Sequence, residues 1–140
     1  MADGTPERMV ALVDALWPQI VKFSRRDPSR LERWAAKPDA DISSTDDAAT
    51  AAEKASKTKS KGRYQAINLT NANTVELRFF RGSLVHETIK AALQLADALV
   101  EYADVHDITE CNAVTWNEIA DIAKYPEFKN YCERIGLICA

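Results

Sequence analysis

An acid and a base stand two residues apart in the stretch Thr-Val-Glu-Leu-Arg-Phe-Phe, residues 74–80. If this stretch is a β-strand, alternation of side chains places Glu76 and Arg78 side by side on one face. The carboxylate could hold a divalent metal ion, and the guanidinium could bind a phosphate or a substrate carboxylate. Arg81, just past the end of the strand, could supply a second cation to the same site.

The same pair of side chains also has a purely structural interpretation. A Glu and an Arg on one face of a sheet commonly form a solvated pair or a cross-strand salt bridge. The pattern alone favours this structural interpretation of Glu76 and Arg78, and it leaves the chemical one open.

A second group of charges lies nearer the start of the chain. Residues 1–37 carry seven Lys or Arg against five Asp or Glu, whereas residues 101–140 carry three against eight. Such asymmetry can steer charged partners, although it does not determine a fold. We therefore expect surfaces for a partner at two groups of side chains: the basic Lys22, Arg25, Arg26, Arg30 and Arg33, and the acidic Asp104, Asp107 and Glu110.

The histidines and cysteines do not have the spacing of a metal site. His86 and His106 have no partner ligands at fixed spacing, and the acids beside His106 do not fit an EF-hand, so we expect a solvated loop there. The three cysteines, Cys111, Cys132 and Cys139, form no Cys-x-x-Cys pair. They are expected to be reduced thiols.

The sequence also bears on location and partners. It contains no run of 18 apolar residues, and its first residues lack the basic and apolar regions of a secretory signal. Together with reduced cysteines, these features predict a cytoplasmic protein. We expect the protein to bind neither a membrane nor, directly, nucleic acid.

Helices are expected before the candidate strand. Apolar residues recur at helical spacing over about residues 6–23, although Pro18 should kink or split that helix. Asp27 and Pro28 start a shorter second helix, with Leu31 and Trp34 on its buried side. The polar segment 38–62 is expected to be a flexible loop with some helix in its alanine-rich part.

The second half of the chain should contain a hairpin and further helices. Segments 64–69 and 74–80 predict two antiparallel strands, and a long helix follows over about residues 84–103. Short helices should begin near Thr115 and Tyr125, the second with Phe128 and Tyr131 facing inward. We expect one α+β domain in which a small antiparallel hairpin packs against four or five helices. Its parts are a helical segment 1–37, the loop 38–62 and the segment 63–140.

The core is expected between the hairpin, the long helix and the first helix. The strand face should present Val75, Leu77 and Phe79 to Ile89, Leu93 and Leu99, while the first helix adds Val13, Leu16 and Ile20. The substitution Leu93→Ala would then cost about 2–5 kcal/mol.

Three parts of the sequence resemble the C-terminal portion of the amidoligase family, which are ATP-dependent carboxylate–amine ligases. The first is an Asn-Leu stretch followed by Thr-Val-Glu-Leu-Arg and Arg-Gly, within residues 63–82. The second is Leu-Trp-Pro-Gln-Ile-Val-Lys-Phe-Ser-Arg-Arg, residues 16–26, with Leu31, Trp34 and Ala35 after it. The third is the helix at 88–95. The Glu-x-Arg strand is also similar to one in relatives of glutamine synthetase and glutamate–cysteine ligase.

The resemblance implies phosphorylation of a carboxylate followed by attack of an amine. It matches Glu76 to a metal-binding carboxylate and Arg78 to a cation that contacts phosphate or substrate. It matches Ser24, Arg25 and Arg26 to a basic segment near the substrate. The implied cofactors are ATP and Mg²⁺, with Mg²⁺ neutralising the phosphates.

The chain also departs from that family. Ligases of this class need several carboxylates from several strands, whereas the sequence offers one candidate. It contains no Gly-rich phosphate loop, and the upstream strands of the family have no counterpart. We therefore expect no complete ATP site in one chain and no cofactor for the chain alone.

Two functions follow from these observations. The favoured one is a non-catalytic, truncated amidoligase-like protein that binds or inhibits a protein or nucleoprotein complex. Because amidoligase-like genes often sit in phages and mobile elements, the resemblance implies a host defence complex as a target. The alternative is an ATP- and Mg²⁺-dependent ligase that completes its site as an oligomer, such as a homodimer, or as a subunit of a split enzyme.

Overall fold

A computed structural model describes residues 3–138 of the chain, so Cys139 lies outside the described residues. The first half contains four α-helices and a short 3-10 helix: α1 (Thr5–Ala15), α2 (Trp17–Ser24), α3 (Pro28–Trp34), α4 (Ala48–Lys57) and η1 (Thr58–Lys61). The second half contains two strands and four α-helices: β1 (Ile67–Asn68), β2 (Glu76–Leu77), α5 (His86–Val105), α6 (Ile108–Asn112), α7 (Trp116–Ile122) and α8 (Pro126–Arg134). The expected α+β class is confirmed in broad outline, but residues 3–138 form eight α-helices rather than four or five.

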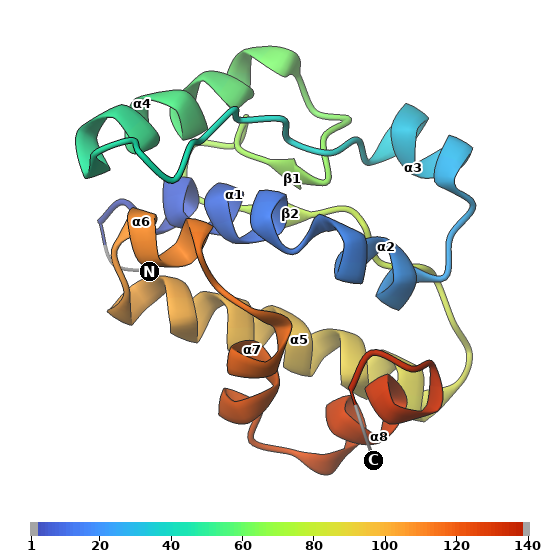
Figure 1. Ribbon diagram of the computed structural model, residues 1–140. Coiled ribbons are helices and arrows are strands. Elements are labelled where there is room, and N and C mark those ends of the chain that lie inside the picture. The colour runs from blue at the N-terminus through green and yellow to red at the C-terminus, as the bar shows by residue number, and fades with distance from the viewer. Residues whose placement is uncertain (1–2, 139–140) are drawn as a thin grey trace.

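The elements form three tiers, with α4 and η1 at the top of Figure 1, α1 and α2 in the middle, and α5, α7 and α8 below. Helix α1 is the centre of the fold and contacts α4, α5 and α6. Its four consecutive residues Val10 to Val13 are all fully buried. A helical turn that is apolar on every side has to be covered on every side, and the two outer tiers provide that cover.

The chain breaks between α1 and α2 at Leu16, whose backbone leaves the helical region at φ −97° and ψ 13°. Pro18 lies in the first turn of α2, where its missing N–H has no helical partner to lose. The predicted split at this proline is therefore confirmed. Val13, Leu16 and Ile20 are buried as expected, at 0–1% exposure.

Segment 38–62 contains α4 and η1. The side chain of Asp47 caps α4 by accepting a hydrogen bond from the backbone N–H of Thr50 at 2.7 Å. Ala51 and Ala55 are fully buried, and α4 packs on α1. Small side chains let the two helices approach closely, so the alanine-rich part of a polar segment becomes a layer of the fold.

The hairpin is shorter than the two strands that the sequence predicts. Ile67 pairs with Leu77, and Asn68 pairs with Glu76, in antiparallel register. Ala36, just after α3, is hydrogen-bonded to the chain before β1, where its N–H donates to the Tyr64 carbonyl at 3.0 Å. The chain that leads into β1 is thus bonded to the end of α3, and β1 in turn pairs with β2, the strand that carries the candidate site.

Helix α5 buries Leu99 as expected, but the rest of its buried face is rotated away from the predicted one. Its buried residues are Ala91, Leu95, Ala98, Leu99, Tyr102 and Ala103, and they contact α1, α7 and α8. Ile89 and Leu93, the predicted contacts of the hairpin, are 42% and 67% exposed. That prediction was wrong because α5 carries two apolar stripes side by side, and helical spacing does not say which of them is covered. The predicted cost of Leu93→Ala is wrong for the same reason.

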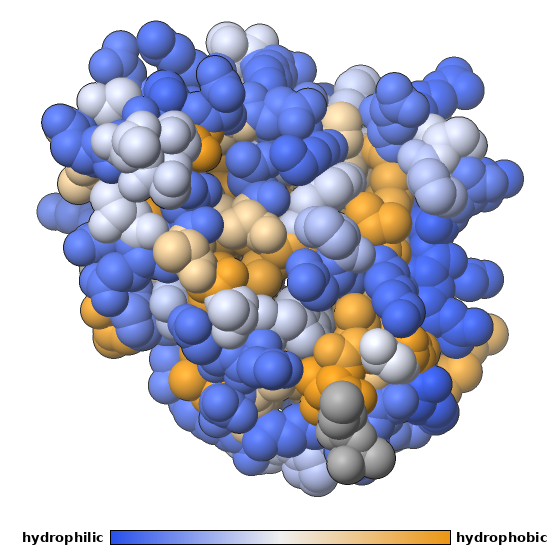
Figure 2. All heavy atoms as spheres, viewed as in Figure 1, coloured by the Kyte–Doolittle hydropathy of each residue, from blue (hydrophilic) through white to orange (hydrophobic). Residues whose placement is uncertain are grey.

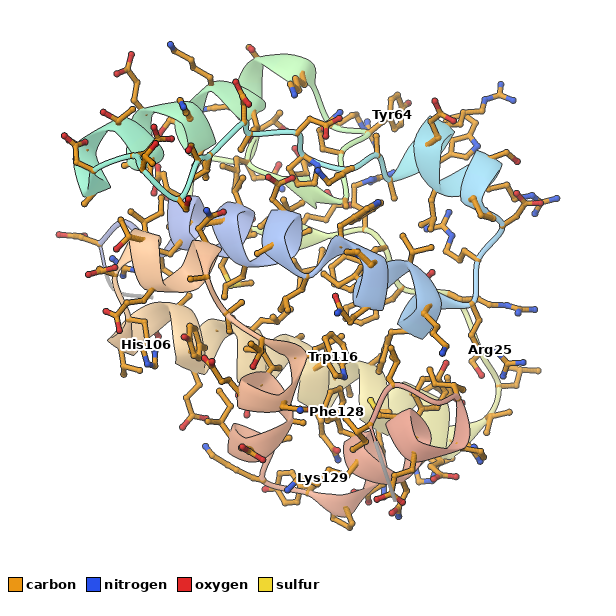
Figure 3. All side chains as sticks on the ribbon, viewed as in Figure 1. Arg25, Tyr64, His106, Trp116, Phe128 and Lys129 are labelled. Atoms are coloured by element: carbon orange, nitrogen blue, oxygen red, sulfur yellow. The ribbon has the colours of Figure 1, made fainter. Side chains whose placement is uncertain are left out.

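The lower tier is held together by aromatic side chains. Phe23 of α2 contacts Trp116, Phe128 and Tyr131, with ring centroids 4.9–6.1 Å apart. Figure 3 shows Trp116 and Phe128 pointing into the space between α5, α7 and α8. The expectation that α8 turns its aromatic face inward is confirmed. Among the described residues, no helix has both the length and the apolar content needed to cross a membrane.

Candidate functional site

The predicted acid and base of β2 bind each other. A guanidinium N–H of Arg78 donates to Oε1 of Glu76 at 2.6 Å. The amide of Asn68, opposite Glu76 in the hairpin register, donates to Oε2 at 3.0 Å. Both carboxylate oxygens of Glu76 therefore have a protein donor.

These contacts keep Glu76 ionised. The hydrogen bond from Asn68, followed by that from Arg78, lowers the pKa of the Glu76 carboxyl below its ordinary value. The side chain is 43% exposed, so water screens the pair and its contribution to stability is small. The geometry fits a structural ion pair within the hairpin.

Arg78 is further positioned by an aromatic pair. Its Nε donates to the Trp34 carbonyl at 3.3 Å, and its guanidinium lies 5.5 Å from the centre of the Tyr64 ring. Trp34 and Tyr64 meet edge to face at 5.3 Å and are 40% and 45% exposed. Trp34 was expected on the buried side of its helix, and this prediction was wrong. Arg33 lies over the Trp34 ring at 4.7 Å.

Sequence reasoning missed Tyr64 and its neighbour Arg63, which lies 5.5 Å from the Tyr64 ring. The signal was present, because an arginine directly precedes an aromatic residue both at Arg33-Trp34 and at Arg63-Tyr64. Their juxtaposition depends on the bridge between the end of α3 and the start of the hairpin. We call Trp34, Tyr64 and the three arginines Arg33, Arg63 and Arg78 the aromatic–arginine cluster.

A separate hollow of about 490 Å³ lies beside this cluster. Four of its lining residues are arginines, and the lining consists of Arg25, Arg26, Asp27, Arg30, Phe80, Arg81 and Gly82. We call Arg25, Arg26, Arg30 and Arg81 with this cavity the arginine hollow. It joins the turn between α2 and α3 to the chain that leaves β2, two segments more than 50 residues apart.

Backbone contacts hold the arginine hollow in shape. Arg25 ends α2 in the left-handed region at φ 52°, which turns the chain sharply before α3. A guanidinium N–H of Arg26 donates to the Arg78 carbonyl at 2.9 Å, and one of Arg81 donates to the Arg25 carbonyl at 3.4 Å. Figure 3 shows Arg25 at the edge of the molecule, below α3.

The positive charge of the arginine hollow is only partly compensated locally, because Asp27 is in the lining and interacts electrostatically with Arg30. Within residues 3–138, none of its four arginines forms an ion pair with a carboxylate within 4.0 Å. Asp27 is the acid in the lining, and its carboxylate accepts from the N–H and hydroxyl of Ser29 at 2.8 and 2.7 Å. Guanidinium groups in this arrangement can bind carboxylate or phosphate oxygens of a partner.

The other predicted surface residues have local roles. Lys22 lies outside the hollow and donates to the Gly136 carbonyl at 3.3 Å. Asp104 accepts a hydrogen bond from the hydroxyl of Thr5 at 2.6 Å. Asp107 and Glu110 form the capping box of α6, each side chain accepting from the other residue's backbone N–H at 2.8 and 3.2 Å. The acidic cluster is thus the start of a helix and not the solvated loop that we expected.

The two histidines and the two described cysteines lie apart from both groups. His106 follows α5 and stacks on Tyr102 with ring centroids 3.7 Å apart. Cys111 and Cys132 are fully buried. In the part of the chain that the structure describes, no three His, Cys, Asp or Glu side chains are grouped so that they could share a metal ion.

Comparisons of the chain with protein-family models, with curated proteins and with solved structures find no match. The resemblance to amidoligases therefore stays a prediction from the sequence motifs.

Proposed function

We propose that this protein is a binding module that contacts an acidic surface of a protein or nucleoprotein complex through the arginine hollow. The observation that carries the proposal is the convergence of Arg25, Arg26, Arg30 and Arg81 on one cavity without ion-pair partners among the described residues. A surface of one sign attracts a partner of the opposite sign and raises the rate of association.

The aromatic–arginine cluster supports a macromolecular partner over a small ligand. Trp, Tyr and Arg are the residue types that carry most of the free energy at protein interfaces. Exposed Trp34 and Tyr64 adjoin the hollow, because Arg26 of the hollow binds the backbone of Arg78 in the cluster. The two features together offer a charged and an aromatic contact region on one flank, and Figure 2 shows mostly hydrophilic side chains on the flank around α3.

The state of Glu76 supports binding over ligase chemistry. Its two oxygens accept from Asn68 and Arg78, so the amidoligase-like strand serves here to hold Arg78 and the hairpin. In this proposal the chain is a truncated amidoligase-like protein that no longer performs the reaction. A host defence complex, the target that the resemblance implies, belongs to the class of partner proposed.

Affinity capture from a host lysate tests the proposal when three variants are compared with the natural sequence. The double substitution Arg30→Glu with Arg81→Glu reverses two exposed charges of the hollow. Glu76→Gln removes the candidate metal ligand, and Lys59→Glu reverses an exposed charge on η1, away from the hollow. We expect a partner that is captured by the natural sequence, Glu76→Gln and Lys59→Glu, and that is lost with the double substitution.

Salt provides a second arm of the experiment. Capture should weaken as ionic strength rises, because exposed charges are screened over about 8 Å at physiological salt. A partner that is retained by the double substitution but lost with Glu76→Gln would overturn the proposal and favour the ligase alternative.

A further inference from the structure

Helix α5 carries a second apolar stripe, and its neighbours leave the largest side chains in the first half of this stripe exposed. Val85, Ile89 and Leu93 recur every four residues, at the helix N-cap and along its first half, and are 56%, 42% and 67% exposed. Ala92, Ala96 and Val100 continue the stripe and are half-buried. The stripe lies next to the buried face on the helix surface, so α5 is apolar over more than half of its circumference.

A contiguous apolar stripe in water marks an interaction surface more often than isolated exposed residues do. Leu84, just before the stripe, is fully exposed and extends it into the preceding loop. Figure 2 shows hydrophobic residues at the lower right edge of the molecule, where Figure 1 places the loop before α5. This surface adjoins the arginine hollow, because Arg25 and Arg81 line a neighbouring cavity together with Leu84 and Val85.

Two opposite charges border the stripe, one on each side of Leu93 along the helix. Lys90 precedes Leu93 by three residues and Asp97 follows it by four, so both lie on the same edge of the stripe. Lys90 is 46% exposed at its side chain and lies 3.8 Å from Glu127, and Asp97 is exposed. The midpoint between these two charges falls beside the most exposed leucine of the stripe.

We propose that this face of α5 binds α5 of a second copy of the chain, antiparallel, about a two-fold axis beside Leu93. An antiparallel two-fold pair brings the same edge of both helices together. Lys90 of each copy then faces Asp97 of the other, so the charge pattern is self-complementary, as a two-fold interface requires. The four-residue spacing of Val85, Ile89 and Leu93 forms the ridge that packs between the ridges of the second helix.

Sedimentation equilibrium of the full chain over a range of concentrations tests the proposal. The natural sequence should form a dimer, and Leu93→Asp should remain a monomer with an unchanged helical circular-dichroism spectrum. Leu93 is exposed in the single chain, so its substitution leaves the monomer's core intact. A natural sequence that stays monomeric at every concentration would overturn the proposal.

Charge exchange tests the antiparallel register. Lys90→Glu alone, or Asp97→Lys alone, turns two attractions into two repulsions and should weaken the dimer by about tenfold. Combining the two substitutions restores opposite charges and should return the dissociation constant to within about twofold of the natural value. Lys59→Glu is the control and should have no effect. A double variant weaker than either single one would refute this register.

Cross-linking tests the position of the axis. In a Cys139→Ser background, Leu93→Cys places a thiol beside the two-fold axis in each copy, and mild oxidation should give a covalent dimer. Val105→Cys is the matched control: Val105 is 72% exposed on the same helix, but its two copies would be about 35 Å apart. Cross-linking through position 105 and not through position 93 would contradict the proposed axis.

Discussion

Glu76 illustrates how one residue can match a catalytic motif and still have a structural role. Its carboxylate accepts from Arg78 within its own strand and from Asn68 across the hairpin. Asn68 is itself buried at 3% exposure, so its amide group needs a partner, and Glu76 provides one. The hydrogen bonds among these three side chains fix the register of the two-residue pairing between β1 and β2.

The charge of Glu76 should make a small, pH-dependent contribution to stability. Because folding lowers its pKa, the contribution is present above the unfolded value of 4.5 and is lost as the pH falls through the lower folded value. Glu76→Gln should therefore lower the free energy of unfolding by about 0.5 kcal/mol at pH 7. Urea unfolding at pH 7 and at pH 3 measures the difference, which should shrink at pH 3. A difference that grows at pH 3 would contradict the assignment.

The buried thiols should be chemically inert in the folded protein. Burial raises the pKa of both Cys111 and Cys132 to about 12. At pH 8 the thiolate fraction is then on the order of one in 10,000, and the thiolate is the reactive form. In a Cys139→Ser background, a thiol reagent such as dithionitrobenzoate should label neither residue until urea is added. Rapid labelling of the native variant would show that one of these side chains is accessible.

At the scale of elements, α5 carries one apolar stripe that packs in the core and a neighbouring one whose larger side chains are exposed. One stripe contains alanines that let α1 and α8 approach closely, and the other contains the larger, exposed Ile89 and Leu93. Gln94 secures the α8 side, where its side chain accepts from the N–H of Phe128 at 2.8 Å and donates to Glu127 at 3.0 Å. The helix is therefore docked firmly on one side and left uncovered on the other.

A matched pair of substitutions on α5 separates the two stripes. Leu95 is fully buried and Leu93 is 67% exposed, only two residues away. Leu95→Ala should lower the free energy of unfolding by about 2–5 kcal/mol through cavity formation. Leu93→Ala should change it by no more than about 0.5 kcal/mol when the chain is dilute enough to be monomeric. Equal losses in denaturant unfolding would show that the buried stripe has been misassigned.

Local sequence signals were enough for some elements and not for others. Pro18 predicted the break between α1 and α2, and alternation in the strand predicted that Glu76 and Arg78 share a face. The capping box of α6 was present as Asp107 and Glu110 but was interpreted as loop. These features depend on residues within one turn of each other, which is the range over which spacing is informative.

Features that depend on tertiary packing could not be predicted. Arg25 and Arg81 meet only because α3 and the hairpin are bridged through Ala36. The covered face of α5 depends on where α1 and α8 lie, and the phase of the seven-residue α3 could not place Trp34. The arginines of the hollow could be picked out in the sequence, but their grouping in one cavity depends on the tertiary structure.

For the whole molecule, three surfaces can be distinguished, and Arg81 borders both the arginine hollow and the apolar Leu84 and Val85. The arginine hollow and the aromatic–arginine cluster occupy the flank formed by α3 and the hairpin, while the acidic Asp107 and Glu110 start α6 beside α1 and α4. The uncovered stripe of α5 forms a third surface. Such a division suits a protein that makes contacts with more than one macromolecule, and we propose an acidic partner on one surface and a second copy on another.

The central claim is that Glu76 and Arg78 hold the hairpin, and that the chain acts by binding. It is tested most directly by measuring ADP release from ATP and Mg²⁺ by the purified full chain, in the presence of a carboxylic acid and an amine. We expect ADP release no faster than without protein, both for the natural sequence and for Glu76→Gln. Release that requires the natural protein and disappears in Glu76→Gln would contradict the account.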